Sequence, residues 1–457
     1  MTMIHRLSLF LLIALLPLSQ GQAETVVLDL QQAVDRALEV DPRITEKERH
    51  VDLARAQLRE VRGADGWSLS MNTFLGFAPK VRGGVFETTN EDGTKSIGVA
   101  SDAFDINGLS PWYYLEMRLV KPLHTFGKIT HYSKAAAGNI QVKRGDIQLA
   151  RAQTRMDIAK AYYGYLAARD SRRLLDDTLG KLQASLDLLQ GWLDEGEGDA
   201  KQSNLFALQT GTALLKRYQV EAQGYERIAL EGLRILTGLG VNDEIQVADK
   251  RLKPLPLPEG TLKELTARAM TRRPEVRQLA AGLDARREYM LAKRSESLPN
   301  LYAGLAGSAS YAPGRKDFTD VSIYDPFYFA GMTPVIGLKW DWNSGRQPAQ
   351  VAQAKAELDA TLALRDKARM GIPFQVAEQY HTVHSHYEMV QRLYEGSRSG
   401  RRWLISVYAD FEAGVEETDK LVAAFQGYVL AYGDYLRVVN AYNMHVERLR
   451  VVTGDIQ

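Results

Sequence analysis

The sequence contains no cysteine among its 457 residues. No disulfide framework can hold the chain together, and no cysteine can serve as a nucleophile. A lipid cannot be attached through an amino-terminal cysteine either. The stability of the chain must therefore come from packing.

Charge of one sign and long apolar runs are also lacking. The 57 basic and 56 acidic residues leave a formal net charge of +1 and are interspersed, which gives no electrostatic footprint for nucleic acid. Beyond the amino terminus no apolar stretch approaches the roughly 20 residues of a transmembrane helix. A helical inner-membrane protein is excluded, whereas a β-barrel remains possible.

Catalytic motifs are weak or incomplete. The sequence GKIT at Gly127 lacks the upstream glycine of a phosphate-binding loop. Glu378 and His381 have the Glu-x-x-His spacing of helical metal sites, but the matching positions of the first half are Lys160 and Tyr163. Interhelical packing is the better account of these residues. We expect no enzyme, no cofactor and no metal.

The amino terminus has the features of a secretory signal. An apolar run from Leu7 to Leu18 is too short to span a bilayer, and small residues at Gly21 and Ala23 suit a signal peptidase. We predict a signal peptide at residues 1–23 and an exported mature chain.

The most informative feature is a tandem repeat. Two capped stretches that run to a proline, two glycine-led stretches and two Thr-Gly endings recur in the same order. They are DLQQAVDRALEVDP from Asp29 and TLKELTARAMTRRP from Thr261, the segments at Gly127 and Gly345, and RILTG and RVVTG ending at Gly238 and Gly454. We predict a first repeat at 24–249, a proline-rich linker at 250–260 and a second repeat at 261–457.

Each repeat has one predicted order of elements. A capping box opens a helix of about 35 residues, and two strands of about 10 residues follow it. A helix of about 65 residues and a returning helix of about 35 residues complete the repeat. Four strands cannot close a barrel, and open sheet edges are costly in lipid, so a membrane-bound chain must oligomerise. Two copies would give eight strands and three would give twelve; a soluble sandwich is the alternative for these strands.

In this order and doubling, the motifs resemble the TolC family of outer-membrane efflux proteins. The resemblance covers about residues 28 to 454 and rests on a few doubled features. They are Asp41-Pro42 and Arg273-Pro274, Gly127 and Gly345, the two Thr-Gly endings, and the inter-helix tips from Asp194 and from Ala409.

The resemblance implies a mainly α fold with a transmembrane β-barrel. Tandem-duplicated long helical hairpins would form a periplasmic α-barrel, and four strands per chain would join a 12-stranded barrel in a homotrimer. The chain would be the outer-membrane channel-tunnel of a tripartite efflux or type I secretion system in a Gram-negative bacterium. Its expected partners are outer-membrane lipid, a periplasmic adaptor (membrane fusion) protein and an inner-membrane transporter of RND, ABC or MFS type.

The resemblance also implies roles for individual residues. Gly127 and Gly345 would form the strand-to-helix turns. The tip residues that would meet the adaptor are Gly198, Gly414, Leu205 and Leu421.

The tips are rich in carboxylates, which could form an acidic channel entrance. The candidates are Asp199, Glu416, Glu417 and Asp419. Alternatively, acidic residues at the start of a helix interact favourably with the helix dipole and stay solvated. The family's best-known members have lumen-lining aspartates where this chain has Lys420 and Ala423. A ring of aspartates at the entrance therefore cannot be carried over to this chain.

A second function class stays open from the sequence. A non-pore periplasmic or cell-surface scaffold of coiled helices would be soluble without detergent, whereas a channel would require detergent for extraction.

Overall fold

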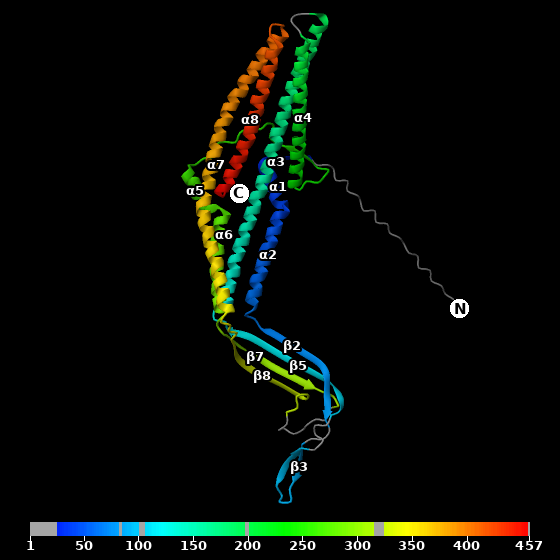
Figure 1. Ribbon diagram of the computed structural model, residues 1–457, viewed down its shortest axis with the longest axis vertical. Helices are drawn as coiled ribbons and strands as arrows, with labels where there is room; N and C mark the ends of the chain where they lie inside the picture. The colour runs from blue at the N-terminus through cyan, green and yellow to red at the C-terminus, as the bar shows by residue number, and fades with distance from the viewer. Residues whose placement is uncertain (1–24, 82–84, 100–105, 197–200, 315–323, 456–457) are drawn as a thin grey trace, which may run out of the picture. The chain divides into compact units, whose positions relative to one another are not determined.

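The computed structural model describes residues 25–81, 85–99, 106–196, 201–314 and 324–455 (Figure 1). The predicted signal peptide at 1–23 lies outside these residues. The chain divides into two units, and each unit takes segments from both halves of the sequence. The helical unit consists of Met1–Pro42, Arg151–Gly260 and Ala377–Val451. The sheet unit consists of Arg43–Ala150, Thr261–Val376 and Val452–Gln457.

The opening helix of each repeat is two helices, so the prediction of one continuous helix of about 35 residues was wrong. The first copy is α1 (Leu30–Val40) and α2 (Pro42–Gly63), and the second is α5 (Leu262–Arg272) and α6 (Pro274–Ser295). Both predicted capping boxes are present, at Asp29 and Thr261. The break falls at Asp41 and Arg273, which are extended, because a following proline disfavours the α conformation.

The long helical hairpins form as predicted. α3 (Lys128–Glu195) has 68 residues and α7 (Arg346–Glu412) has 67, and both run through the two units. The returning helices are α4 (Gln202–Leu236), with 35 residues, and α8 (Thr418–Thr453), with 36. Within the helical unit, α4 and α8 lie beside α3 and α7 (Figure 1).

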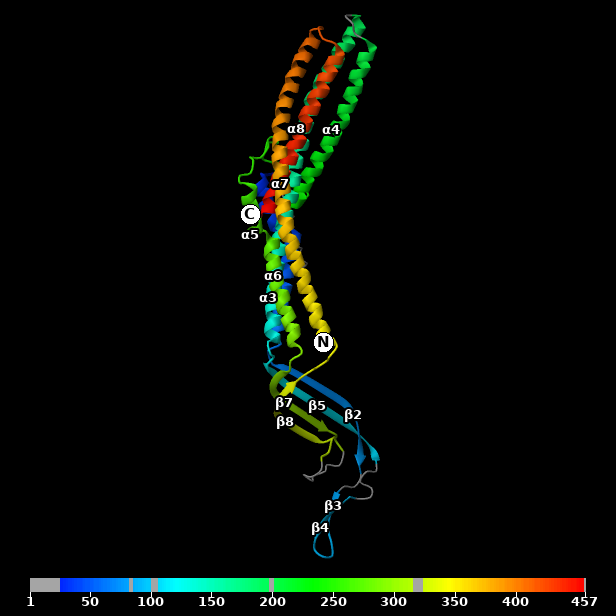
Figure 2. The ribbon, with the colours of Figure 1, turned by 60° about the vertical axis from the view of Figure 1, so that its left-hand side comes forward.

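The sheet unit contains a four-stranded antiparallel sheet in the order β2-β5-β7-β8 (Figures 1 and 2). Its strands are β2 (Ser68–Val81), β5 (Ile106–His124), β7 (Asn300–Tyr311) and β8 (Phe329–Lys339). β5 pairs with β7, so the two repeats supply adjacent halves of one sheet. Within the described residues the sheet is open, with β2 and β8 at its edges.

Two smaller strand pairs were not predicted. β3 (Val85–Thr89) and β4 (Lys95–Val99) form an antiparallel hairpin in the connection from β2 to β5. β1 (Thr25–Leu28) pairs in parallel with β6 (Glu244–Val247). Each of these strands has only four or five residues, too few to give a clear alternation in sequence.

A hydrophobic cluster holds the four helices of the helical unit together near the turns that join them. It combines leucines of α3 and α4 with apolar residues of α7 and α8, among them Leu189, Leu208, Phe411 and Leu421. Each of these four side chains is at most 1% exposed. Burying such side chains supplies roughly 1.5–3 kcal/mol apiece, which a chain without disulfides requires.

Candidate functional site

The sheet has one continuous apolar face. Cross-strand rows such as Met71–Met117–Gly307–Met332 run over all four strands. Met71 and Met332 of this row are exposed, and Leu75 and Ile336 on the same face are 77% and 78% exposed. A soluble protein rarely leaves so large an apolar surface uncovered.

The opposite face of the same strands is largely polar. Next to the apolar Met71, Ser70 and Asn72 point to this face, and both are exposed. Glu116, opposite Asn72, forms an ion pair with Arg118. Phe74 and Tyr114 interrupt the polar residues of this face, but the alternation still gives one face suited to lipid and one largely suited to water.

Large aromatic residues flank the apolar face at both ends. Trp67, Trp340 and Trp342 are exposed near the helices, and the indole nitrogen of Trp340 donates a hydrogen bond to the carbonyl of Ser297 at 3.0 Å. Tyr113 and Tyr311, which pair with each other, are exposed at the other end. Aromatic belts of this kind are typical of side chains at lipid headgroup level.

The two predicted strand-to-helix glycines directly precede the long helices. α3 begins at Lys128, after Gly127, and α7 begins at Arg346, after Gly345. Gly127 has a left-handed φ of +84°, which favours glycine, whereas the φ of Gly345 is not positive. Its amide instead donates to the Asn343 side chain at 3.0 Å.

A polar cluster fastens the start of α3 to the end of α6. His131 contacts Glu288 at 2.7 Å, and the Tyr132 hydroxyl donates to Glu296, which Lys293 also contacts at 3.0 Å. Burial and the bond to Glu296 raise the pKa of Tyr132 to about 12, so its hydroxyl stays protonated and remains a donor.

At the end of α7, the predicted tip residue Gly414 lies in a tight turn. Its φ is +73°, and the amides of Gly414 and Val415 donate to carbonyls of Phe411 and Asp410, both at 2.9 Å. This left-handed glycine cap ends the helix. Gly196 has a φ of +70° after α3. The predicted tip residues Gly198 and Asp199 lie outside the described residues.

The two predicted contact leucines are buried. Leu205 and Leu421 belong to the hydrophobic cluster of the helical unit, where they hold the helix ends together. The exposed apolar side chains nearby are Phe206 and Val415. Sequence alone did not separate these roles, because all four residues are apolar and close to the turns.

The candidate acidic residues differ in their surroundings. Glu416 contacts Lys420 at 2.7 Å, and this bond lowers the pKa of the carboxyl. Glu417 and Asp419 are exposed, and Asp419 lies in the first turn of α8, where a negative charge suits the helix dipole.

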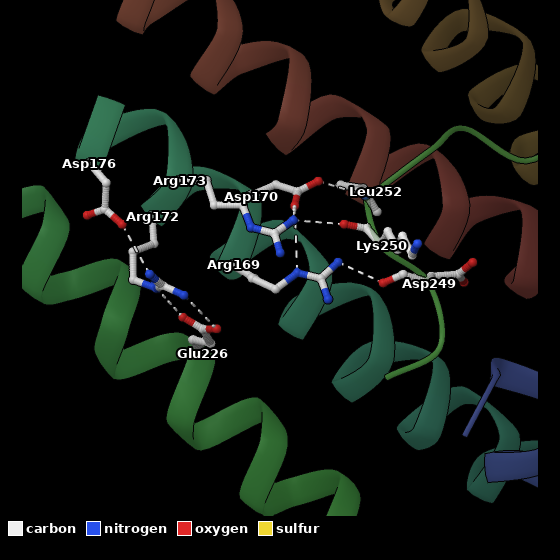
Figure 3. Close-up of polar contacts among 9 residues, drawn as sticks. All are labelled: Arg169, Asp170, Arg172, Arg173, Asp176, Glu226, Asp249, Lys250 and Leu252. Carbon is white, nitrogen blue, oxygen red and sulfur yellow. Dashed lines mark hydrogen bonds and ion pairs between the residues drawn. The ribbon is translucent and has the colours of Figure 1, made fainter. Parts of the chain in front are cut away.

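The sequence analysis missed a network that fixes the proline-rich linker to α3 (Figure 3). The Asp170 carboxylate accepts the amide of Leu252 at 2.7 Å. Arg169 and Arg173 donate to the carbonyls of Asp249 and Lys250, both at 2.8 Å. Arg172 reaches sideways to Glu226 on α4 at 2.6 Å. The linker is therefore a docked part of the helical unit.

A buried ion pair joins α3 and α8. The Arg155 Nε lies 3.0 Å from Glu447 Oε2, and the Arg450 Nη1 lies 2.6 Å from Glu447 Oε1. The Glu447 side chain is 0% exposed. A buried carboxylate is tolerated only when its oxygens are paired in this way.

The histidines of α7 and α8 contact one another. The rings of His386 and His445 lie 4.7 Å apart, and the ring of His445 approaches Gln379 at 3.2 Å. Burial, together with His386 and Arg448, lowers the pKa of His445. The described residues hold no group of three side chains suited to a metal ion.

None of the helices in the described ranges is both long and apolar enough to cross a membrane.

Solved structures with the same fold are known. CusC, studied for its folding and transmembrane channel formation, has 16% identity and a TM-score of 0.74 over 96% of this chain and 95% of its own. The outer-membrane channel CmeC of Campylobacter jejuni has 14% identity and a TM-score of 0.74, over 93% of this chain and 85% of its own. The open outer-membrane channel MtrE of Neisseria gonorrhoeae has 17% identity and a TM-score of 0.71, over 93% and 88%. No family model and no curated protein matches the sequence.

This chain therefore has the fold of the outer-membrane channel proteins. The shared fold agrees with the mainly helical chain and the four-stranded sheet that the doubled motifs indicated. The closed trimeric barrel is a property of an assembly and stays a prediction.

Proposed function

We propose that this chain is the outer-membrane channel of an export system and conducts its cargo without chemical change. The single observation that carries the proposal is the two-faced sheet. Its apolar face is flanked by aromatic side chains and its reverse face is polar, as expected for a wall between lipid and a water-filled pore.

The pore requires more than one copy. β2 and β8 leave unpaired edges on the described sheet, and backbone groups without partners are too costly in lipid. Three chains would pair these edges into a 12-stranded barrel. Twelve is an even number, as in other outer-membrane barrels.

α4 supplies a second feature that suits an assembly. It bears exposed apolar residues at the spacing of a heptad repeat, which is typical of a helix that packs against another helix. They are Leu214, Tyr218, Tyr225, Ile228 and Ile235. In the proposed trimer they would lie against a helix of a neighbouring chain.

The helix turns would meet a periplasmic adaptor, which would couple the channel to an inner-membrane transporter. The buried Leu205 and Leu421 would support the contact from inside, while Val415 and Phe206 would touch the partner. Glu417 and Asp419 would add negative charge near the entrance. A photoreactive probe on Val415→Cys should crosslink a membrane fusion protein in cells. The proposed contact is wrong if the same probe on the remote Gly180→Cys crosslinks that protein equally well.

The assembly is tested by the mass of the extracted protein. Outer-membrane fractions would be dissolved in detergent, and light scattering would be corrected for bound detergent. We expect a mass of three mature chains. A single chain that is soluble without detergent would contradict the proposal and favour the non-pore scaffold.

A further inference from the structure

The polar face of the sheet is not open along its whole length. Near the helices, Ser70 and Asn72 on this face are exposed. At the far end of the same strands, Ala78 and Ser110 are 0% exposed, although they point to the same face. Their neighbour Phe77, which points to the apolar face, is 70% exposed. Something covers the polar face at this end alone.

The two described ends of the connection from β7 to β8 contribute to this cover. The hydroxyl of Ser110 donates to the carbonyl of Pro313, and that of Ser310 donates to the carbonyl of Pro326 at 2.9 Å. Ser310 is itself buried, as is Ala312 beside Pro313. Two serines of the polar face thus bind two backbone carbonyls of the chain above them.

An aromatic contact strengthens this attachment. The indole nitrogen of Trp112 donates to Ser310 Oγ at 2.7 Å, and its ring meets Phe327 edge to face, with centroids 5.5 Å apart. Asp325 accepts the amide of Phe327 at 3.0 Å, which fixes the turn that delivers this ring. The covering segment therefore has its own local structure and is bonded to the strands below.

We infer that Ala312–Gly314 and Asp325–Phe327 form a strap that narrows the outer end of the pore. The inference rests on the proposed function, in which the polar face lines the pore. Three straps would lie inside one barrel, one from each chain. The width of the pore at this end would then depend on the strap, and with it the size of the cargo.

The first test asks whether the strap covers the polar face. Because the chain lacks cysteine, Ala78→Cys carries the only thiol, and Asn72→Cys is the matched control on the uncovered part of the same face. With a charged thiosulfonate and detergent-extracted protein, we expect Ala78→Cys to react at least about tenfold more slowly, because local opening must precede labelling. Equal rates would overturn the strap.

The second test asks whether the strap narrows the pore. In planar bilayers, the double variant Ser110→Ala and Ser310→Ala should raise single-channel conductance at least about twofold. Both side chains are buried, so neither narrows the pore directly. Ser185→Ala, which removes a buried hydroxyl of α3 in the helical unit, should leave conductance unchanged. Unchanged conductance in a double variant whose Ala78→Cys labelling has become fast would overturn the narrowing.

These outcomes separate the strap from the proposed function. Absence of any conductance in the wild-type trimer would refute the channel, whereas the labelling rates would still decide whether the strap exists. If the double variant fails to assemble, the labelling of Ala78→Cys in the otherwise unchanged chain decides. Fast labelling there would reject the inference.

Discussion

A lysine on either face of β2 should have opposite consequences. Met71 lies in a row of the apolar face, between the tryptophans at one end and the tyrosines at the other. Asn72 is its neighbour on the polar face. If the sheet is a barrel wall, Met71→Lys places a charge near the middle of the lipid, whereas Asn72→Lys places it in water.

The cost of the charge follows from this position. A lysine near the midplane of a barrel costs about 2–4 kcal/mol on the lipid face, so three copies cost roughly 6–12 kcal/mol in a trimer. An exposed surface substitution in water costs less than about 0.5 kcal/mol. Met71 is 64% exposed, so packing within the chain cannot account for a large loss at this site.

The assay is the amount of folded trimer in outer-membrane fractions, measured by gel mobility with and without heating. We expect Met71→Lys to lower the trimer yield by at least about tenfold, since 1.4 kcal/mol already corresponds to tenfold in an equilibrium. Asn72→Lys should assemble almost as well as wild type. Equal assembly of the two variants would refute the assignment of the apolar face to lipid.

Three further predictions concern the helices, and melting of detergent-extracted protein, followed by circular dichroism, tests each. Glu447→Gln should lower the free energy of unfolding by about 3–5 kcal/mol, because it breaks a buried ion pair. Asp434→Asn, on the exposed side of α8, should change this free energy little. Gly454→Ala should cost at least about 2 kcal/mol, since the glycine has a φ of +82° and a Cβ there would lie 2.9 Å from backbone atoms; Gly180→Ala, with open space, should be neutral or stabilising. The pKa of His445 is lower in the folded protein than the ordinary value of 6.5, so the unfolded chain binds a proton first as the pH falls. The contribution of the neutral His445 to stability is therefore complete above pH 6.5 and is lost as the pH falls through the pKa of the folded state. His445→Gln should remove this part of the acid sensitivity, and an unaltered pH profile would contradict the assignment.

Much of the fold follows from local signals that occur twice. Gly238 and Gly454 end α4 and α8 in left-handed conformations, and each packs against the end of an opening helix. A Cβ on Gly238 would meet Val40, and one on Gly454 would meet Arg272. The repeated Thr-Gly endings therefore record a repeated contact, which explains why they were a reliable guide to the architecture.

The misjudged helices show where local reading was incomplete. Proline is favoured at the first position of a helix, so Pro42 and Pro274 start new helices and do not continue the old ones. The helical periodicity on both sides of each proline concealed the break. The available signal was the position of Asp41 and Arg273 directly before a proline, because a residue there avoids the α conformation. Both residues are extended in the structure.

The candidate site was predictable where it depends on alternation and not where it depends on distant contacts. The two faces of the sheet follow from the period of two residues in β2 and β5. The bonds of Asp170 to Leu252 and of Ser310 to Pro326 join residues that no local pattern relates. The burial of Leu205 and Leu421 is likewise a product of tertiary packing.

The most direct test of the channel is electrical. Purified trimer would be inserted into planar lipid bilayers, and single-channel currents would be recorded at fixed salt. The account predicts discrete, ohmic conductance steps that are absent with heat-denatured protein. A correctly folded trimer that inserts into the bilayer and passes no ions, even with both Ser110→Ala and Ser310→Ala in place, would contradict it.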